Sequence, residues 1–524
     1  MDYGILSLVP PILACGLAFA TKQVVVSLLI ALFSGALILQ NYNLLNAFTE
    51  TCGTYITGSI TSSGHAATII FLLIMSGMIA LVEESGGLQT IAKSLSGKIK
   101  NERAAQVITS LLGCLVFFDD YANILIVGPT ASPISDRVGV SREKQTYIVH
   151  TTAGVVAGIA VFTTWIGFEM GLINDAFSAM GYQINAFTVV IKNIPYMMYN
   201  ILAIVLLFAV AGMVRDFGPM YNAEKRARTT GQVLSENDHK TDYSLEAVQN
   251  TKESKLTYAL LPILTFALVT FFGLWYSGYE FVGREIAFFS IDGFRESLAN
   301  ADPMPVCVWA SMASLIVAVL ISKLFLKDSF QHIYETWLKG FTDLCEVCII
   351  LVLAWGLGSV INDIGTADYI ISLVGDKAPA EIFPAVIFIV SCLISFATGT
   401  SWGTMPIMFP IAIPLVSSLV ENPTESTLVI ATIAAVLSGC IFGDQTSPIS
   451  DSSIVTSAAV GCNLIDHIKT EAPYELFPAL LAVVGYLLIG FCSISVWIVL
   501  VITTILTIAF VRFIGKSTQR ADLN

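Results

Sequence analysis

The sequence predicts an all-α polytopic membrane protein with two inverted-topology repeats that contain broken helices and re-entrant hairpins. The prediction rests on three observations. Charged residues are few, the apolar residues form long runs, and an internal repeat has its Lys- and Arg-rich flanking loops on opposite sides of the membrane in its two copies. Of the 524 residues, 55% are hydrophobic and only 12% are charged, whereas soluble domains carry roughly 25% charged residues. Because lipid removes the need for a charged surface, a chain this long and this poor in charge belongs in a membrane.

The apolar residues are gathered into runs that are almost free of charge. A helix needs about 20 apolar residues to cross a bilayer, and the runs suggest about ten to fourteen membrane elements of full or shorter length. The runs lack the alternation of apolar and polar residues that is typical of the strands of a membrane β-barrel. The runs are Leu6–Ala20, Val24–Leu39, Ala66–Val82, Tyr147–Phe168, Val189–Val214, Leu256–Trp275, Val306–Ile321, Cys345–Ile361, Phe383–Phe396, Thr427–Phe442 and Leu476–Val511.

A polar segment divides the chain into an N-terminal membrane half (1–214), a flexible linker (215–255) and a C-terminal membrane half (256–524). Lys and Arg favour the cytoplasmic side, so the linker and the basic C-terminal tail are expected in the cytoplasm and the N-terminus outside. The net charge of −13 argues against a nucleic-acid partner. The ten cysteines are read as packing residues, and the five histidines form no ligand cluster in the sequence.

A weak internal repeat relates the two halves, at a constant shift of 279 positions (351 − 72 = 279). The flanking charges place both ends of the first-half segment Ala104–Ser135 inside and both ends of its counterpart Phe383–Val420 outside. Inverted repeats with interrupted helices are the architecture of secondary transporters. The matching pairs are Leu72 and Leu351, Gly77 and Gly356, Gly86 and Gly365, Ile91 and Ile370, and Phe117 and Phe396.

Polar residues interrupt the apolar runs at two aligned places, one in each repeat. The first is FFDDYAN (117–123), where Asp119, Asp120 and Asn123 follow an uninterrupted apolar stretch. A charge at the bilayer centre costs about 2.5–3.5 kcal/mol on insertion scales, so such carboxylates are expected to face water, an ion or a partner. The second is TGTSWGT (398–404), where Thr398, Thr400 and Ser401 could offer oxygen ligands to a cation; tight helix packing through small residues is the alternative.

Two further interruptions also correspond in the repeat. In GDQTSPISD (443–451), Gly and Pro are expected to end the preceding helix, so that Asp444, Thr446, Ser447 and Asp451 line irregular backbone. In TTWIGFE (163–169), Glu169 lies either within the membrane or at the outer end of its helix. The pentapeptide SPISD occurs at both 132–136 and 447–451. This spacing does not fit the repeat, which leaves an insertion or coincidence as explanations.

At these motifs the chain resembles the NhaC family of sodium/proton antiporters within the ion transporter superfamily. The resemblance covers about residues 60–490, through FFDDYAN, SREK (141–144), TTWIGFE, TGTSWGT and the long stretch GDQTSPISDSSIVTSAAVGCNLIDHIKTEAPY (443–474). It implies a multi-pass protein of a bacterial or archaeal cell membrane that exchanges sodium for protons. Some relatives carry malate, lactate or amino acids instead. Gln445 stands where the family suggests a basic residue or histidine, which argues against a proton role for position 445.

The expected function is therefore exchange of sodium ions for protons, with Asp444, Asp119, Asp120, Thr400 and Ser401 as candidate sodium ligands. The expected partners are membrane lipid, sodium and protons, with no resident cofactor; a homo-oligomer and a small organic solute stay open. A carrier of a small carboxylate or amino acid is the main alternative, although no Lys or Arg lies within the four interruptions. A membrane enzyme is disfavoured because the sequence has no His–Glu metal motif, and a channel because of the inverted repeat.

Overall fold

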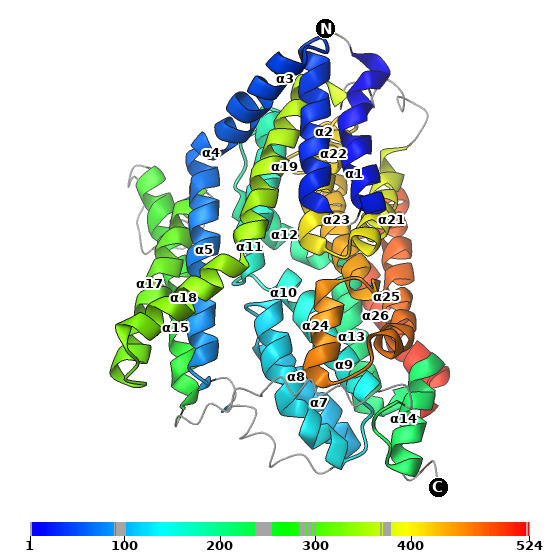
Figure 1. Ribbon diagram of the computed structural model, residues 1–524. Helices are drawn as coiled ribbons and strands as arrows, with labels where there is room; N and C mark the ends of the chain where they lie inside the picture. The colour runs from blue at the N-terminus through cyan, green and yellow to red at the C-terminus, as the bar shows by residue number, and fades with distance from the viewer. Residues whose placement is uncertain are drawn as a thin grey trace.

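The computed structural model is a helical bundle whose helices run mostly along one direction (Figure 1). It describes residues 3–21, 23–87, 90, 101–235, 254–282, 290, 293, 296–297, 300–366, 369, 379–519 and 522. Among these, eight helices are long and apolar enough to cross a membrane, and two bent helix pairs bring the number to ten. Three shorter apolar helices accompany them. The protein is therefore a multi-pass membrane protein, as its sequence predicts.

The first half consists of scaffold helices, a helical hairpin and two bent spans. The bent spans break between α10 and α11, at 46°, and between η4 and α13, at 50°. In chain order the elements are η1 (Gly4–Leu8), α1 (Val9–Thr21), α2 (Val24–Leu39), α3 (Leu44–Glu50), η2 (Thr51–Thr57), α4 (Gly58–Thr61), α5 (Ser63–Glu84), α7 (Glu102–Leu115), α8 (Asp120–Arg137), α9 (Arg142–His150), η3 (Thr151–Val155), α10 (Val156–Ile159), α11 (Thr164–Ala179), α12 (Ala186–Asn193), η4 (Ile194–Tyr196) and α13 (Met198–Met213).

The second half repeats this order after a polar helix and ends with one additional span. Its helix pair α15 and α17 packs against α5 of the first half, so the two halves share a scaffold. The elements are β1 (Arg215–Asp216), α14 (Gly218–Thr230), α15 (Leu256–Phe281), α17 (Pro303–Leu324), α18 (Phe330–Asp343), α19 (Cys345–Asp363), η6 (Ala380–Ile382), α21 (Phe383–Thr398), α22 (Ser401–Ser417), α23 (Thr427–Thr446), α24 (Asp451–Val460), α25 (Leu464–Cys492), α26 (Val496–Phe513) and β2 (Lys516–Ser517).

The corresponding helices α5 and α19 run in opposite directions, which confirms the inverted repeat. Along α5, His65 stacks on Trp355 of α19 with ring centroids 3.8 Å apart, while Ser76 donates to the carbonyl of Gly340 in the preceding helix α18 at 2.6 Å. As residue numbers rise along α5, the residue numbers of its partners in the second repeat therefore fall. The paired residues Ile91 and Ile370 lie outside the described part of the chain.

The two hairpins, α7–α8 and α21–α22, enter the bundle from opposite ends (Figure 1). Both ends of the first hairpin reach Arg228 of α14, which lies 3.5 Å from Glu102 and donates to the carbonyl of Gly139 at 3.2 Å. The segment therefore enters and leaves on one side, as predicted. Its turn lies at the centre of the molecule, opposite the turn of the second hairpin.

The segment between the halves is folded as far as residue 235, which corrects the expectation of a flexible linker there; residues 236–253 lie outside the described part of the chain. Strand β1 pairs antiparallel with β2, with Arg215 opposite Ser517 and Asp216 opposite Lys516. Helix α14 packs against α9 and α25. The linker and the C-terminal tail thus share one end of the molecule, and the N-terminus lies at the other end (Figure 1).

The two copies of the pentapeptide SPISD do not lie at corresponding places in the two repeats. Its first copy lies within helix α8, while its second copy forms the break between α23 and α24. Helix α8 corresponds to α22 in the repeat, so the match is a coincidence. The N-cap residues Thr163 and Ser450 begin the corresponding helices α11 and α24.

Candidate functional site

The turn of the first hairpin presents two carboxylates at the beginning of α8. Asp119 caps this helix and accepts a hydrogen bond from the backbone N–H of Ala122 at 2.9 Å. Its other oxygen accepts from the hydroxyl of Thr164, the first residue of α11, at 3.2 Å. Asp120 is 6% exposed and faces the indole N–H of Trp165 at 3.5 Å. The turn of the hairpin and the break before α11 therefore meet.

The second hairpin turns at two residues, Gly399 and Thr400. Gly399 has φ of +72°, and a Cβ on it would lie 2.9 Å from the carbonyl oxygen of Ile449, so this position suits only glycine. Thr400 caps α22. The next residue, Ser401, donates to Asp444 Oδ2 from its backbone N–H at 3.2 Å and from its hydroxyl at 2.8 Å. This turn therefore holds the carboxylate of Asp444.

Asp444 lies in the last turn of α23, which corrects the expectation that it lines irregular backbone. The helix continues to Thr446, and Ser447, the residue before Pro448, has extended backbone with ψ of 126°. A residue that precedes proline disfavours the helical conformation, so the helix ends there and not at Gly443. Asp444 Oδ1 accepts from the hydroxyls of Ser450 and Ser452, the latter at 3.2 Å.

Four carboxylates gather where the two turns and the two breaks meet. Asp120 lies within electrostatic range of Asp119, Asp444 and Asp451, and the hydroxyl of Tyr121 donates to Asp451. Asp119 and Asp444 are half-buried and Asp451 is exposed. In the described part of the chain, Asp120, Asp444 and Asp451 form no ion pair with Lys or Arg. This acid cluster is the candidate cation site.

The remaining hydroxyl and amide candidates bond mainly to the backbone. The side-chain N–H groups of Asn123 donate to the carbonyls of Gly113, Val116 and Thr152 at 2.7–3.2 Å. Ser447 donates to the carbonyl of Phe396 at 2.7 Å. The hydroxyls of Thr398 and Thr446 donate to carbonyls of their own helices. Asn123 and these hydroxyls hold the turns together, and among the hydroxyl ligands expected from the sequence Ser401 is the one that bonds to a carboxylate of the cluster in the described structure.

Glu169 is buried inside α11, with 3% exposure, and does not mark the outer end of that helix. Its Oε1 has no hydrogen-bond partner within the described residues. Within the described structure it makes no hydrogen bond or ion pair with the acid cluster, and Trp165, which faces Asp120, lies one helical turn before it. The structure therefore places Glu169 within the membrane-spanning part but apart from the other candidates.

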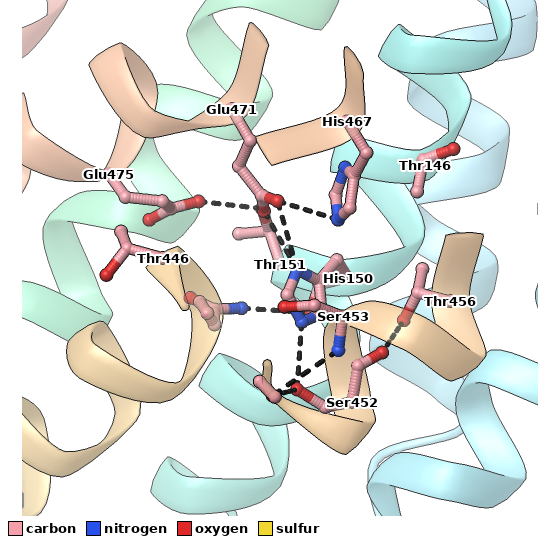
Figure 2. A network of polar contacts seen from close by, with 12 residues as sticks. Thr146, His150, Thr151, Thr446, Ser452, Ser453, Thr456, His467, Glu471 and Glu475 are labelled. Atoms are coloured by element: carbon pink, nitrogen blue, oxygen red, sulfur yellow. Dashed lines mark hydrogen bonds and ion pairs between the residues drawn. The ribbon is translucent and has the colours of Figure 1, made fainter. Parts of the chain in front are cut away.

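A second polar network, shown in Figure 2, joins histidines and glutamates behind the acid cluster. His150 Nδ1 lies 3.0 Å from Glu471 Oε2, and His467 Nε2 lies 2.9 Å from the same oxygen. His150 Nε2 lies 3.0 Å from the hydroxyl of Ser452, which connects this network to Asp444. The expectation that the histidines form no cluster is thus wrong, because the fold brings together residues more than 300 positions apart.

Ligand atoms of His150, His467 and Glu471 all lie within 4.8 Å of one another, so distance alone would admit a metal ion. The N···O separations are 2.9 Å for His467, an ion-pair contact, and 3.0 Å for His150, which also has hydrogen-bond geometry. Ligands around a tetrahedral zinc stand about 3.3 Å apart, given bond lengths near 2.05 Å. Both separations are shorter than this spacing, so direct contact between the histidines and the carboxylate describes the triad better than zinc coordination.

Glu475 and Gln445 extend the same network. The hydroxyl of Tyr199 lies 2.7 Å from both Glu475 Oε2 and Gln445 Oε1, and Gln445 donates to the carbonyl of His150 at 3.0 Å. Gln445 thus bonds to Tyr199 and to the backbone of His150, and the absence of a proton role at this position stays a prediction. Glu471 and Glu475 were missed in the sequence because both lie in the polar first part of α25, before the apolar run that begins at Leu476.

A cavity of about 510 Å³ lies on the other side of the acid cluster. Its walls include His65, Asp175, Trp355, Asn362, Pro414 and Ser418. His65 and Asp175 form an ion pair at 2.7 Å. Along α11 the cavity begins at Leu172, about 12 Å beyond Thr164 at 1.5 Å per residue.

Three aromatic rings occupy the space between this cavity and the carboxylates. Trp402 lies with its ring centroid 5.2 Å from that of Trp165 and 4.6 Å from that of Phe168. Trp165 and Phe168 belong to α11, and Trp402 to α22. Trp165 and Phe168 therefore lie between Thr164, which contacts Asp119, and Leu172, which lines the cavity, along α11.

Inverted repeats, paired hairpins and a polar centre define the protein as a secondary transporter. A solved transporter has the same fold: MtrF of Neisseria gonorrhoeae, described as illuminating a class of antimetabolite efflux pumps, aligns with a TM-score of 0.59 and 12% identity over 87% of this chain and 86% of its own. The chain belongs to the Na+/H+ antiporter family, whose sequence model matches residues 4–161 and 156–491. This confirms the resemblance seen in the motifs.

Relatives in this family differ in how they are described. An uncharacterized protein of Haemophilus influenzae is 30% identical over 495 residues, covering 93% of this chain and 91% of its own length. A malate-2H(+)/Na(+)-lactate antiporter of Bacillus subtilis is 25% identical over 182 residues, covering 35% of this chain and 37% of its own. The second of these similarities fits a secondary transporter.

Proposed function

We propose that this protein exchanges sodium ions for protons across the cell membrane, with the sodium ion bound between the two hairpin turns. Asp444, Asp119 and Asp120 supply carboxylate ligands in this proposal, and Ser401 supplies a hydroxyl. The observation that carries it is the acid cluster, in which Asp120, Asp444 and Asp451 lack ion pairs with Lys or Arg in the described part of the chain. A hard cation with oxygen ligands is the natural partner of such a cluster.

The balance of charge at the cluster favours a cation over an anion. Helices α8, α11, α22 and α24 all begin there, and each N-terminus contributes about +0.5 of a charge. The four together supply about +2, against the four carboxylates of Asp119, Asp120, Asp444 and Asp451. With the carboxylates ionised, an excess of negative charge is left for a cation or protons to neutralise.

Exchange follows if the carboxylates hold either sodium or protons, but not both at once. Movement of one repeat against the other then exposes the loaded site to each side in turn. In this conformation the aromatic cluster of Trp165, Phe168 and Trp402 separates the site from the cavity near His65. We assign the cavity as the sodium entrance on the side expected outside, because the ends of α5 and α11 that line it adjoin loops poor in Lys and Arg.

The test is dye-monitored proton flux in everted membrane vesicles with sodium added. Asp444→Asn keeps the shape and hydrogen bonding of the side chain but removes its charge, so sodium-dependent proton flux is expected to vanish at normal protein levels. Glu421→Gln, which removes an exposed acid between α22 and α23, is the matched control and is expected to behave as wild type. Normal flux in Asp444→Asn would refute this assignment of the site.

A carrier of a small carboxylate is the second candidate, favoured by the four helix N-termini that meet at the cluster. N-terminal ends bind anions, and bound sodium or protons would neutralise the carboxylates first. Malate or lactate added to the same vesicles distinguishes the two. An organic acid that is required for sodium-dependent proton flux supports this candidate, and flux with sodium alone supports sodium–proton exchange.

A further inference from the structure

Behind the cation site, His150, Glu471 and His467 form a buried triad between α9 and α25 (Figure 2). Each side chain is at most 1% exposed. Glu471 lies between the two imidazoles: His150 Nδ1 donates to it at 3.0 Å, and His467 Nε2 lies 2.9 Å from the same oxygen as an ion pair that lacks hydrogen-bond geometry. Each of the two imidazoles can bind one additional proton, so the triad can hold one or two protons more than the buried carboxylate could hold alone.

The single hydrogen of the Ser452 hydroxyl links the triad to Asp444. Ser452 lies 3.2 Å from Asp444 Oδ1, 3.0 Å from His150 Nε2 and 2.9 Å from the hydroxyl of Ser450, which itself donates to Asp444. With Glu471 ionised, the Nδ1 of His150 faces only acceptor oxygens and therefore carries a hydrogen. When Ser452 donates to Asp444, either directly or through the hydroxyl of Ser450, His150 Nε2 must donate to Ser452, so the ring is a cationic imidazolium. When Ser452 donates to His150, the ring is neutral.

We infer that His150, Glu471 and His467 form a second ion-binding site, specific for the proton, which exchanges its proton with Asp444 through the hydroxyl of Ser452. This inference rests on the proposed function. The step is balanced: the proton leaves His150 Nε2 for Ser452 Oγ while the hydrogen of Ser452 passes to the carboxylate of Asp444. Imidazolium and carboxylate become imidazole and carboxylic acid, and the reverse step frees Asp444 for sodium.

The charges that surround His150 favour the protonated ring. From α25 it faces Glu471, Glu475 and His467, and from α23 it faces Asp444. From α24 it faces the neutral Ser452. On its own helix Lys144 is paired with Asp216, and on α14 Arg226 and Arg228 pair with Glu143 and Glu224. Three carboxylates against one other histidine leave an excess of negative charge around the ring.

The triad lies on the opposite side of Asp444 from the cavity, so the two ions have separate approaches. None of its residues lines the cavity. His467 is in the first turn of α25, next to Asp466, whose carboxylate accepts from Ser235 of the folded linker at 2.5 Å. Protons therefore reach the triad from the end of the molecule that carries α14, while sodium uses the cavity near His65.

The experiment compares two activities of the purified protein in proteoliposomes over a range of pH: sodium-driven proton flux and exchange of sodium for labelled sodium. Sodium–sodium exchange needs Asp444 but no net proton transfer. In Glu471→Gln and His150→Gln we expect sodium–sodium exchange to stay within about twofold of wild type, while sodium–proton exchange falls about tenfold or more. Since the lost carboxylate no longer favours imidazolium, the pH of half-maximal flux in Glu471→Gln should fall by about one unit or more.

His332→Gln is the matched control, because His332 is an exposed histidine paired with Glu84, far from the triad in the sequence and outside it in the fold. It should match wild type in both activities. Two results would overturn the inference: parallel loss of both activities with an unchanged pH profile, and stoichiometric zinc in the purified protein that disappears in His467→Gln. A wild-type protein without either activity would instead refute the proposed function itself.

Discussion

The buried ion pair of Lys144 and Asp216 ties the linker to the helix that carries His150. Lys144 Nζ lies 2.7 Å from Asp216 Oδ1, and neither side chain is exposed. Tyr474 and Thr518 also donate to Asp216, each at 2.8 Å. The pair therefore connects α9, β1, α25 and the C-terminal tail, and its loss should loosen all four.

Lys144→Met leaves the carboxylate of Asp216 buried without its counter-ion. Breaking a buried pair in this way costs about 3–5 kcal/mol. At about 2.1 cal/mol/K per residue, unfolding of 524 residues changes the entropy by about 1.1 kcal/mol/K. The expected fall in the melting temperature is therefore about 3–5 °C. Lys144→Met combined with Asp216→Asn removes both charges and should recover most of this loss.

The effect should depend on pH with a definite sign. In the wild type, burial acts to raise the pKa of Asp216, but the Lys144 ammonium and the hydrogen bonds from Thr518 and Tyr474 hold it below its ordinary value. The pair therefore stabilises the protein above the unfolded pKa of about 3.9 and is lost only below it. In Lys144→Met burial is unopposed, so the Asp216 pKa rises and acidification relieves the penalty. The wild-type advantage should shrink from pH 8 to pH 5.

The assay is thermal unfolding of detergent-solubilised protein followed by gel filtration, at pH 8 and pH 5. Lys469→Met, at an exposed position of α25, is the control for loss of a lysine and should leave the melting temperature unchanged. A Lys144→Met protein that melts within 1 °C of wild type, or whose deficit is equal at both pH values, would refute the reasoning, because an uncompensated buried carboxylate must respond to protons.

Three further predictions concern the gate, the first hairpin and the orientation. Trp402→Ala removes the ring between the cavity and the acid cluster and should raise sodium leak into proteoliposomes; a leak equal to that of wild type would contradict the gate. Asn123→Leu leaves three backbone carbonyls without their donor and should cost roughly 1–3 kcal/mol of stability, measured by thermal unfolding, without changing sodium affinity. Weaker sodium binding at normal stability would instead make Asn123 a ligand. In a cysteine-free background, an impermeant thiol reagent applied to intact cells should label Tyr42→Cys but not Thr229→Cys, and the reverse pattern would invert the orientation.

The acid cluster illustrates how far the sequence identifies the site. A carboxylate within an apolar run is costly in any membrane fold, so Asp119, Asp120 and Asp444 could be singled out before any contact was known. Their mutual approach could not be foreseen, because it depends on how four helix ends meet at one point. The same holds for Ser401, whose neighbours Thr398 and Thr400 looked equally suitable but face their own backbone.

The class of the protein and its inverted repeat were determined by the sequence alone, because hydropathy and the positions of Lys and Arg constrain each membrane segment locally. The triad of His150, Glu471 and His467 was decided only by the tertiary structure. Two of its members are four positions apart on one helix, but the third lies more than 300 positions away, and no local pattern encodes that distance. Packing of α9 against α25 brings them together, and the hydroxyl of Ser452 then joins them to Asp444.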